Sequence, residues 1–187
     1  MIPDIPRLNR DQYYQLYENG LFNDVRVELV DGYLIDKGKQ TPAHAATVCL
    51  AHTVLRELFS DGWWCRNQSP LHLTEFSEPD IDVAVVRGNV RDFADHPTSA
   101  ELAVEISDNS LTYDTTTKGG LYAQALIPEY WVVDLVHRQL VVHRQPKRPR
   151  SGAARYEEVA VYEADADAVV KPLAKPKASV KVADLLP

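Results

Sequence analysis

The sequence predicts a mixed α/β or α+β fold, with a central β-sheet that has at least one helix packed on either side. Two short segments, IDVAVVR at 81–87 and AELAVEIS at 100–107, are rich in aliphatic residues, as is typical of buried strands. Two segments with helical spacing of apolar residues, 41–60 and 114–126, flank them. With 187 residues, 45% of them hydrophobic, the chain is long enough to bury a core and is expected to form one domain over 1–187.

A short helix and a β-hairpin are predicted before the sheet. Residues 9–19 have helical spacing, and Asn9 is a suitable N-cap. In VRVELVDGYLIDKG, Asp31 and Gly32 lie between two β-rich runs, which is the strongest short hairpin signal a sequence offers. The predicted fold therefore includes an N-terminal hairpin.

The next segments predict a long helix followed by two short strands. The helix over 41–60 can be capped by Thr41, and Pro42 suits its first turn. WWCRN and PLHLTE then predict two strands joined near residues 68–70.

The second half of the chain predicts a helix, a hairpin, a strand and a docked tail. The helix over 114–126 follows the AELAVEIS strand, and YWVVDL and QLVVHR form a hairpin around 136–138. The segment YEEVAVYE is a further strand. The tail over 171–187 carries three prolines and four lysines and ends in apolar residues that we expect to pack on the core.

Composition excludes some classes of protein. No apolar run approaches the ~20 residues that span a bilayer, and the N-terminus lacks the layout of a secretory signal. Cys49 and Cys65 have no metal-knuckle spacing and predict free thiols in a reducing cytoplasm. The six histidines form no HxH or HExxH motif, and the net charge of −7 argues against a protein that coats nucleic acid through bulk charge. An enzyme that gathers acids around a metal ion remains compatible with this charge.

Glu105 is the first residue that points to chemistry, because it interrupts the aliphatic AELAVEIS strand. A carboxylate buried there needs a cation or hydrogen-bond donors. Asp80 follows Pro79 at the start of the 81–87 strand, and Asp82 lies on the same face. If the two strands are neighbours, Asp80 and Glu105 meet at one end of the sheet, where Mg²⁺ or Mn²⁺ would suit their oxygen ligands.

Lys118 is the cation expected near Glu105, because it lies in the first turns of the helix that follows the strand. From there it can reach the end of the strand and orient a water beside a metal ion. Other interpretations stay open: Glu105 can form a structural ion pair with Arg26, and Lys118 can be an ordinary solvated residue. His44 is expected to start its helix or pack on the sheet, Asp114 to cap the following helix, and the basic run 147–150 to form a solvated loop.

Several short motifs occur together in a particular order. They are VELVDG at 27–32, P-x-H at 42–44, Pro79-Asp80, VEIS at 104–107, D-x-x-x-K at 114–118, Tyr122 and PEYWVVD at 128–134. Together they resemble the Uma-two family, which belongs to the PD-(D/E)xK restriction-endonuclease-like superfamily. The resemblance covers about residues 10–145 and leaves 146–187 as a C-terminal extension expected to pack on that core.

The resemblance implies a restriction-endonuclease-like sheet flanked by helices and assigns roles to several residues. Asp80 and Glu105 would bind the metal, with the backbone carbonyl of Ile106 as a third ligand, and Glu28 would be an additional acid. The lysine of the superfamily normally stands where this chain has Ser107, so Lys118 on the next helix takes its place. Gly119 and Gly120 after Lys118 are expected to weaken that helix by about 1 kcal/mol each.

The function implied is a metal-dependent endonuclease, using Mg²⁺ or Mn²⁺, that hydrolyses phosphodiester bonds of DNA. A homodimer is expected, since cutting both strands of a duplex requires two sites. The alternative is a catalytically inactive nuclease-fold module that binds or regulates. A third, weaker possibility is a hydrolase of small phosphate esters, which would have a narrow pocket in place of an open groove.

Overall fold

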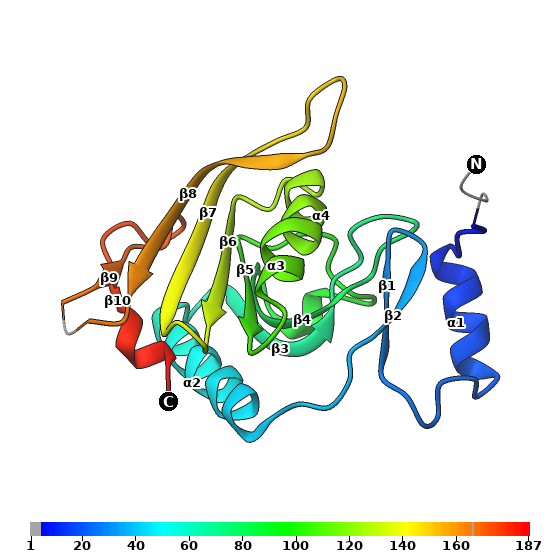
Figure 1. The fold of residues 1–187 in the computed structure, drawn as a ribbon, viewed down its shortest axis with the longest axis horizontal. Helices are drawn as coiled ribbons and strands as arrows, with labels where there is room; N and C mark the ends of the chain where they lie inside the picture. The colour runs from blue at the N-terminus through cyan, green and yellow to red at the C-terminus, as the bar shows by residue number, and fades with distance from the viewer. Residues whose placement is uncertain (1–4, 166) are drawn as a thin grey trace.

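A six-stranded mixed sheet forms the centre of the protein, as the computed structural model shows for residues 5–165 and 167–187 (Figure 1). The strands lie in the order of the chain, and β5–β6 is the one parallel pair among them. They are β3 (Trp63–Pro70), β4 (Asp80–Arg87), β5 (Leu102–Ser107), β6 (Glu129–Asp134), β7 (Gln139–Lys147) and β8 (Arg155–Glu163). The predicted mixed sheet is confirmed.

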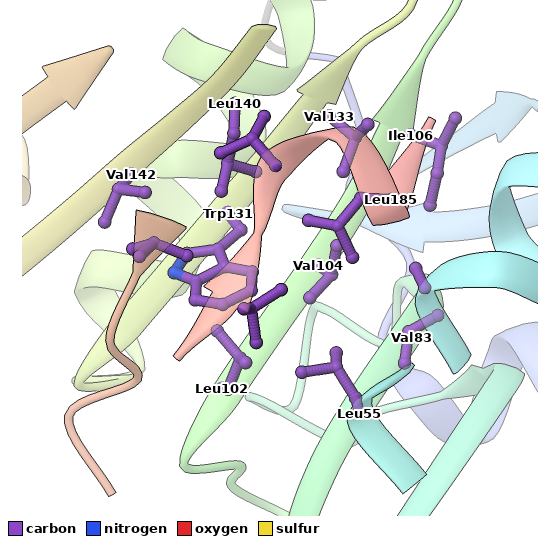
Figure 2. Close-up of a cluster of buried hydrophobic side chains, with 14 of the residues drawn as sticks. Leu55, Val83, Leu102, Val104, Ile106, Trp131, Val133, Leu140, Val142 and Leu185 are labelled. Atoms are coloured by element: carbon purple, nitrogen blue, oxygen red, sulfur yellow. The ribbon is translucent and has the colours of Figure 1, made fainter. Parts of the chain in front are cut away.

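Helices cover both faces of this sheet. Alternate residues of β4 and β5 point to opposite sides, and both sets include apolar residues that must be buried. Helix α2 (Pro42–Leu58) packs on the face that carries Val83 and Val104. The other face carries Ala84 and Ala103 and is covered by α4 (Gly119–Gln124). Figure 2 shows the first of these cores, with Leu55 and Leu185 packed beside strand residues such as Val83 and Val104. Layers of helix, sheet and helix are the predicted arrangement.

The N-terminal elements lie beside the start of β4. Helix α1 (Arg10–Glu18) has Asn9 as its N-cap in a capping box, as predicted. Strands β1 (Val27–Val30) and β2 (Tyr33–Asp36) form the predicted hairpin. Its turn uses positive φ at Asp31 (51°) and Gly32 (81°), which a two-residue hairpin of this kind requires. A bridge from Leu29 to Glu78 joins the hairpin to the chain just before β4.

The prediction of two strands between residues 63 and 75 is wrong. One strand, β3, runs through the expected joint and stays paired with β4 on both sides of Gln68. Gln68 has a positive φ of 44°, but the strand continues through this residue and the chain does not turn there. The turn comes later, where Thr74 and Ser77 bridge each other.

The helix after β5 is also more irregular than predicted. It consists of α3 (Leu111–Tyr113), a π-helical turn η2 (Asp114–Lys118) and α4, and it ends at Gln124. A short 3₁₀ turn η1 (Val90–Asp92) lies between β4 and β5.

The tail packs on the core, as its apolar end predicted. It forms a small hairpin of β9 (Val169–Val170) and β10 (Val180–Lys181), then a 3₁₀ turn η3 (Val182–Leu185). Val182 and Leu185 are fully buried in the same core as α2. Cys49 and Cys65 are free thiols. In the part of the chain that the structure describes, no helix has both the length and the apolar character needed to cross a membrane.

Candidate functional site

A cavity of about 310 Å³ lies where the end of β5 meets the start of α2, the hairpin and the π-helical turn. Its lining is rich in charged and polar side chains from segments far apart in the sequence. These are Glu28, Asp36, Lys37, His44, Asp82, Glu105, Ser110, Tyr113, Asp114 and Lys118. The neighbourhood therefore combines buried carboxylates with two ammonium groups.

Glu105 is buried on β5, and its partners come from the helix above it. The Nζ atom of Lys118 donates a hydrogen bond of 2.8 Å to Glu105 Oε1, and the hydroxyl of Tyr122 donates one of 2.6 Å to the same oxygen. Lys118 is only 5% exposed, so it is not the solvated residue that was the alternative. Arg26, the other expected partner of Glu105, lies exposed on the surface.

Asp82, and not Asp80, shares this cavity with Glu105. Its Oδ2 atom accepts a hydrogen bond of 2.9 Å from the backbone N–H of Ile106 and lies 3.3 Å from Nε2 of His44. Asp80 is less buried, and its carboxylate lies 3.5 Å from Nζ of Lys37 and lines a neighbouring cavity. Asp80 was expected to lie beside Glu105, but the structure places Asp82 there.

The register of the strands explains this difference. Val83 pairs with Val104 across β4 and β5, which puts the preceding Asp82 beside the end of β5 at Glu105 and Ile106. Asp80 lies two residues further along β4, a distance of about 6.6 Å on an extended chain. Both aspartates share a face by their spacing, so only the register distinguishes them.

Glu28 and Lys37 join the site from the N-terminal hairpin and the residue after it. Glu28 Oε1 lies 3.3 Å from Nζ of Lys118, so Lys118 is shared between two buried carboxylates. Glu28 Oε2 accepts a hydrogen bond of 3.1 Å from the backbone N–H of Asp80. Lys37 lies 3.8 Å from Glu28 and donates a hydrogen bond of 2.7 Å to the backbone carbonyl of Asp80. The hairpin thus ties the acidic end of β4 to Lys118.

The π-helical turn brings Asp114 and Lys118 to the same cavity, and both are buried. Asp114 was expected to cap the helix, but it lies within the π-helical turn. Its carboxylate accepts a hydrogen bond of 2.5 Å from the hydroxyl of Ser110. Single π-helical turns often mark functional sites.

Sequence reasoning missed Lys37, His44 and Tyr113 as members of the site. His44 stands in the first turn of α2 because Thr41 caps that helix, and P-x-H was the signal that could have pointed to it. Buried Nδ1 of His44 and the buried hydroxyl of Tyr113 have no hydrogen-bond partner among the described protein atoms. Both residues line the cavity, so a ligand or water is needed to satisfy these two groups.

Burial and neighbouring negative charges disfavour the ionised forms of two carboxyl groups in the site, those of Glu105 and Asp114. Burial raises the pKa of Glu105 to about 8, Lys118 offsets this only in part, and Asp82, Asp114 and Glu28 add to it. Burial is also the main cause of the raised pKa of Asp114. The ionised forms of these two carboxyl groups therefore lack a sufficient counter-charge, which a bound cation would supply.

Lys118 and Asp82 keep their charges in this site. Burial would lower the pKa of Lys118, but the charges of Glu105 and Glu28 outweigh it and hold that pKa well above its ordinary value. Burial would raise the pKa of Asp82, yet the hydrogen bond and charge of His44 and the N–H of Ile106 keep it below its ordinary value. Asp82 is thus a carboxylate and Lys118 an ammonium group.

The oxygen donors fit a hard divalent cation such as Mg²⁺ or Mn²⁺ better than a softer one. Asp82 and Glu105 lie at the adjoining ends of β4 and β5 and border one cavity. Over residues 5–165 and 167–187, no three His, Cys, Asp or Glu side chains form a ready-made metal cage. Asp82 and Glu105 therefore offer carboxylate oxygens to a cation at this edge of the cavity, which Ile106 also lines.

The comparisons with known proteins agree with this fold. Residues 10–182 match the model of the family Uma2, described as "Putative restriction endonuclease", so the match runs beyond residue 145 into the tail. A solved structure described as a "putative nuclease belonging to DUF820", from Anabaena variabilis, is similar with a TM-score of 0.69 and 15% identity, over 95% of this chain and 97% of that one. At that identity the likeness shows the fold alone. No curated protein matches the chain.

Proposed function

This chain belongs to the Uma2 family, and we propose that it is a metal-dependent endonuclease that hydrolyses phosphodiester bonds of DNA. The observation that carries the proposal is the meeting of the buried side chains of Asp82, Glu105 and Lys118 in one cavity. The first two come from neighbouring strands and the third from the helix after them. From the sequence, Asp80 was expected to be the metal-binding aspartate of β4; we propose Asp82 in its place.

The metal donors proposed are the carboxylates of Asp82 and Glu105, with the backbone carbonyl of Ile106 as the third. A bound Mg²⁺ or Mn²⁺ ion supplies Lewis-acid chemistry, since it makes a coordinated water easier to deprotonate and stabilises charge on phosphoryl oxygens. The hydrogen bond from Ile106 N–H to Asp82 fixes the orientation of this carboxylate. Tyr122 does the same for Glu105.

Lys118 is the proposed catalytic cation. Its ammonium group, held by Glu105 and Glu28, can orient the attacking water or neutralise negative charge that develops on the phosphoryl oxygens. Glu28 acts as a positioning residue, because it contacts Lys118 with one oxygen and the backbone of Asp80 with the other.

A plasmid-nicking assay in Mg²⁺ or Mn²⁺ tests this proposal, with Asp82→Asn compared to Asp80→Asn. Loss of one metal carboxylate should lower the nicking rate by about 100-fold or more, since metal and electrostatic stabilisation carry most of the catalysis. Asp80→Asn changes the neighbouring carboxylate by the same chemistry but keeps an acceptor oxygen there, so it should retain far more activity than Asp82→Asn. Full activity in Asp82→Asn together with an inactive Asp80→Asn would restore the assignment made from sequence.

A catalytically inactive binding or regulatory module is the second candidate. Two observations favour it: Lys118 already pairs with both Glu105 and Glu28, and the described residues hold no three-ligand metal cage. Such a module would bind nucleic acid without cutting it in either metal. The nicking assay separates the two functions, because the module gives no activity that depends on Asp82.

The expected homodimer and the cytoplasmic location are part of the proposal. Cleavage of both strands of a duplex calls for two copies of the site. The two free thiols, Cys49 and Cys65, support a reducing compartment.

A further inference from the structure

A second cavity, of about 440 Å³, adjoins the candidate site on the side of Asp80. We call it the tyrosine cavity. The residues that define it here are Tyr13, Tyr14, Tyr17, Phe22, Asp80 and His96. Asp80 is the link between the two cavities, because its backbone N–H bonds to Glu28 and its backbone carbonyl to Lys37, both of which line the candidate site. Most of its lining comes from α1 and from the chain between α1 and the hairpin, elements that lie at one end of the molecule (Figure 1).

The aromatic rings of the tyrosine cavity are held in fixed positions. Tyr13 donates its hydroxyl to the carbonyl of Val27 (3.1 Å) and stacks on Phe22 with 5.9 Å between ring centroids. The hydroxyl of Tyr14 is bonded to Glu78, and its ring meets Tyr13 edge-on at 5.5 Å. The polar ends of these two rings are engaged, so the cavity presents rigid aromatic surface.

Tyr17 differs from these rings because it is 60% exposed. It lies one helical turn after Tyr13 on α1 and therefore on the same side of the helix. A large exposed aromatic side chain at the rim of an aromatic cavity provides a stacking surface for a flat ligand.

Two polar residues that line the cavity, His96 and Asp80, offer a donor and an acceptor, and Arg66, which does not line it, fixes the donor. Arg66 is 5% exposed, and its Nη2 atom lies 3.3 Å from Nδ1 of His96. A guanidinium group can only donate, so Nδ1 of His96 accepts and the neutral ring carries its proton on Nε2. His96 is therefore a hydrogen-bond donor through Nε2, and the carboxylate of Asp80 is an acceptor.

We propose that the tyrosine cavity receives one unpaired nucleobase of the nucleic-acid substrate. Flat aromatic walls with a donor and an acceptor match the faces and edges of a base, and 440 Å³ is within the range of cavities that hold small ligands. Because Asp80 joins the cavity to the metal donors, the base would lie near the phosphodiester that is cut. The inference rests on the proposed function and specifies the substrate class: DNA in which a base beside the cut is unpaired, or is flipped out of the duplex at an energetic cost.

The test measures binding of short duplexes that carry 2-aminopurine, a fluorescent base, either in a single-nucleotide bulge or fully paired. EDTA prevents metal-dependent cleavage during the measurement. We expect the wild-type protein to bind the bulged duplex about tenfold more tightly than the paired one and to quench the bulged base. Tyr17→Ala should remove most of this preference, since stacking of one base changes affinity roughly 5- to 150-fold. Tyr33→Ala is the control, because Tyr33 is exposed but does not line the cavity.

Equal affinity for bulged and paired duplexes, or equal losses in Tyr17→Ala and Tyr33→Ala, would overturn the inference. If the protein nicks plasmids in a manner that depends on Asp82 but shows no such preference, the nuclease proposal stands and the base cavity does not. Quenching that depends on Tyr17, without any cleavage that depends on Asp82, would support the base cavity and overturn the nuclease activity.

Discussion

Glu105 can lie on a buried strand because Lys118 and Tyr122 reach it from the helix on the same face of the sheet. The carboxylate was recognisable from the sequence, since a charged residue among aliphatic ones needs a partner. The choice between Asp80 and Asp82 was not, because their spacing puts both on one face of β4. Only the pairing of Val83 with Val104 decides which of them meets Glu105.

Glu129 and Asp134, in the PEYWVVD motif, have structural roles. Glu129 is fully buried and accepts hydrogen bonds from Trp131 Nε1 (3.0 Å), Arg144 (2.7 Å) and the backbone N–H of Leu173 (2.7 Å). It therefore fastens the tail to β6 and β7. The sequence predicted that the tail packs on the core, but not that a buried acid would hold it, because the partners are up to 44 residues away.

Asp134 should make stability depend on pH. Its buried carboxylate accepts hydrogen bonds from the backbone N–H groups of Val136 (3.0 Å) and His137 (3.1 Å) and from the side chain of Gln139 (2.9 Å). Burial raises its pKa, but the bonds with His137 and Gln139 outweigh burial and leave the pKa below its ordinary value. A lowered pKa in the folded state adds stability above the unfolded pKa of about 4, and this stability is lost as the pH falls.

Asp134→Asn is therefore expected to lower the free energy of unfolding by about 1–2 kcal/mol above pH 5, and by progressively less as the pH falls toward 3. Urea unfolding across this pH range measures the difference. Asp61→Asn, at an exposed position after α2, should show no such trend. A loss that is the same at pH 3 and pH 7 would mean that ionised Asp134 is not the cause.

At the scale of elements, the π-helical turn is the feature that the sequence did not predict. Its spacing depends on how the helix packs on β5 and β6, as the hydrogen bond of 3.0 Å from the Tyr130 hydroxyl to the carbonyl of Asp114 illustrates. The two glycines after Lys118 were expected to weaken the helix that carries it by about 1 kcal/mol each. Lys118 is fixed by two buried carboxylates, so the glycines weaken the helix without releasing the lysine.

Gly120→Ala should stabilise the protein, because alanine is about 1 kcal/mol better than glycine inside a helix. A methyl group there would meet the carbonyl of Ala154 at 3.6 Å, which is ordinary van der Waals contact. Thermal unfolding should show a gain of about 0.5–1 kcal/mol. Gly152→Ala is the control, since Gly152 has open space but a φ of +93° that disfavours alanine. Destabilisation by Gly120→Ala would show that the helix needs glycine for a reason beyond packing.

At the scale of the whole molecule, short-range patterns predicted the elements better than their arrangement. Alternating aliphatic residues identified β4 and β5, and Asp31-Gly32 identified the hairpin. The parallel pairing of β5 with β6 follows from the helical segment that connects them, which the sequence predicted between these two strands. The packing of α1 and the hairpin beside β4 could not be predicted, because it depends on contacts such as Leu29 with Glu78 across some fifty residues.

The arrangement of the whole chain brings the acids of three separate segments to one cavity. Glu28 comes from the hairpin, Asp82 from β4 and Glu105 from β5, while Lys118 supplies one of the nearby positive charges. We propose that this excess of buried negative charge holds a divalent cation between Asp82 and Glu105.

Crystals soaked in Mn²⁺ and measured for anomalous scattering test this claim most directly. We predict one strong peak bounded by the carboxylates of Asp82 and Glu105, which is lost in Asp82→Asn and kept in Asp80→Asn. A peak at Asp80, or no peak in the cavity at millimolar Mn²⁺, would contradict the account.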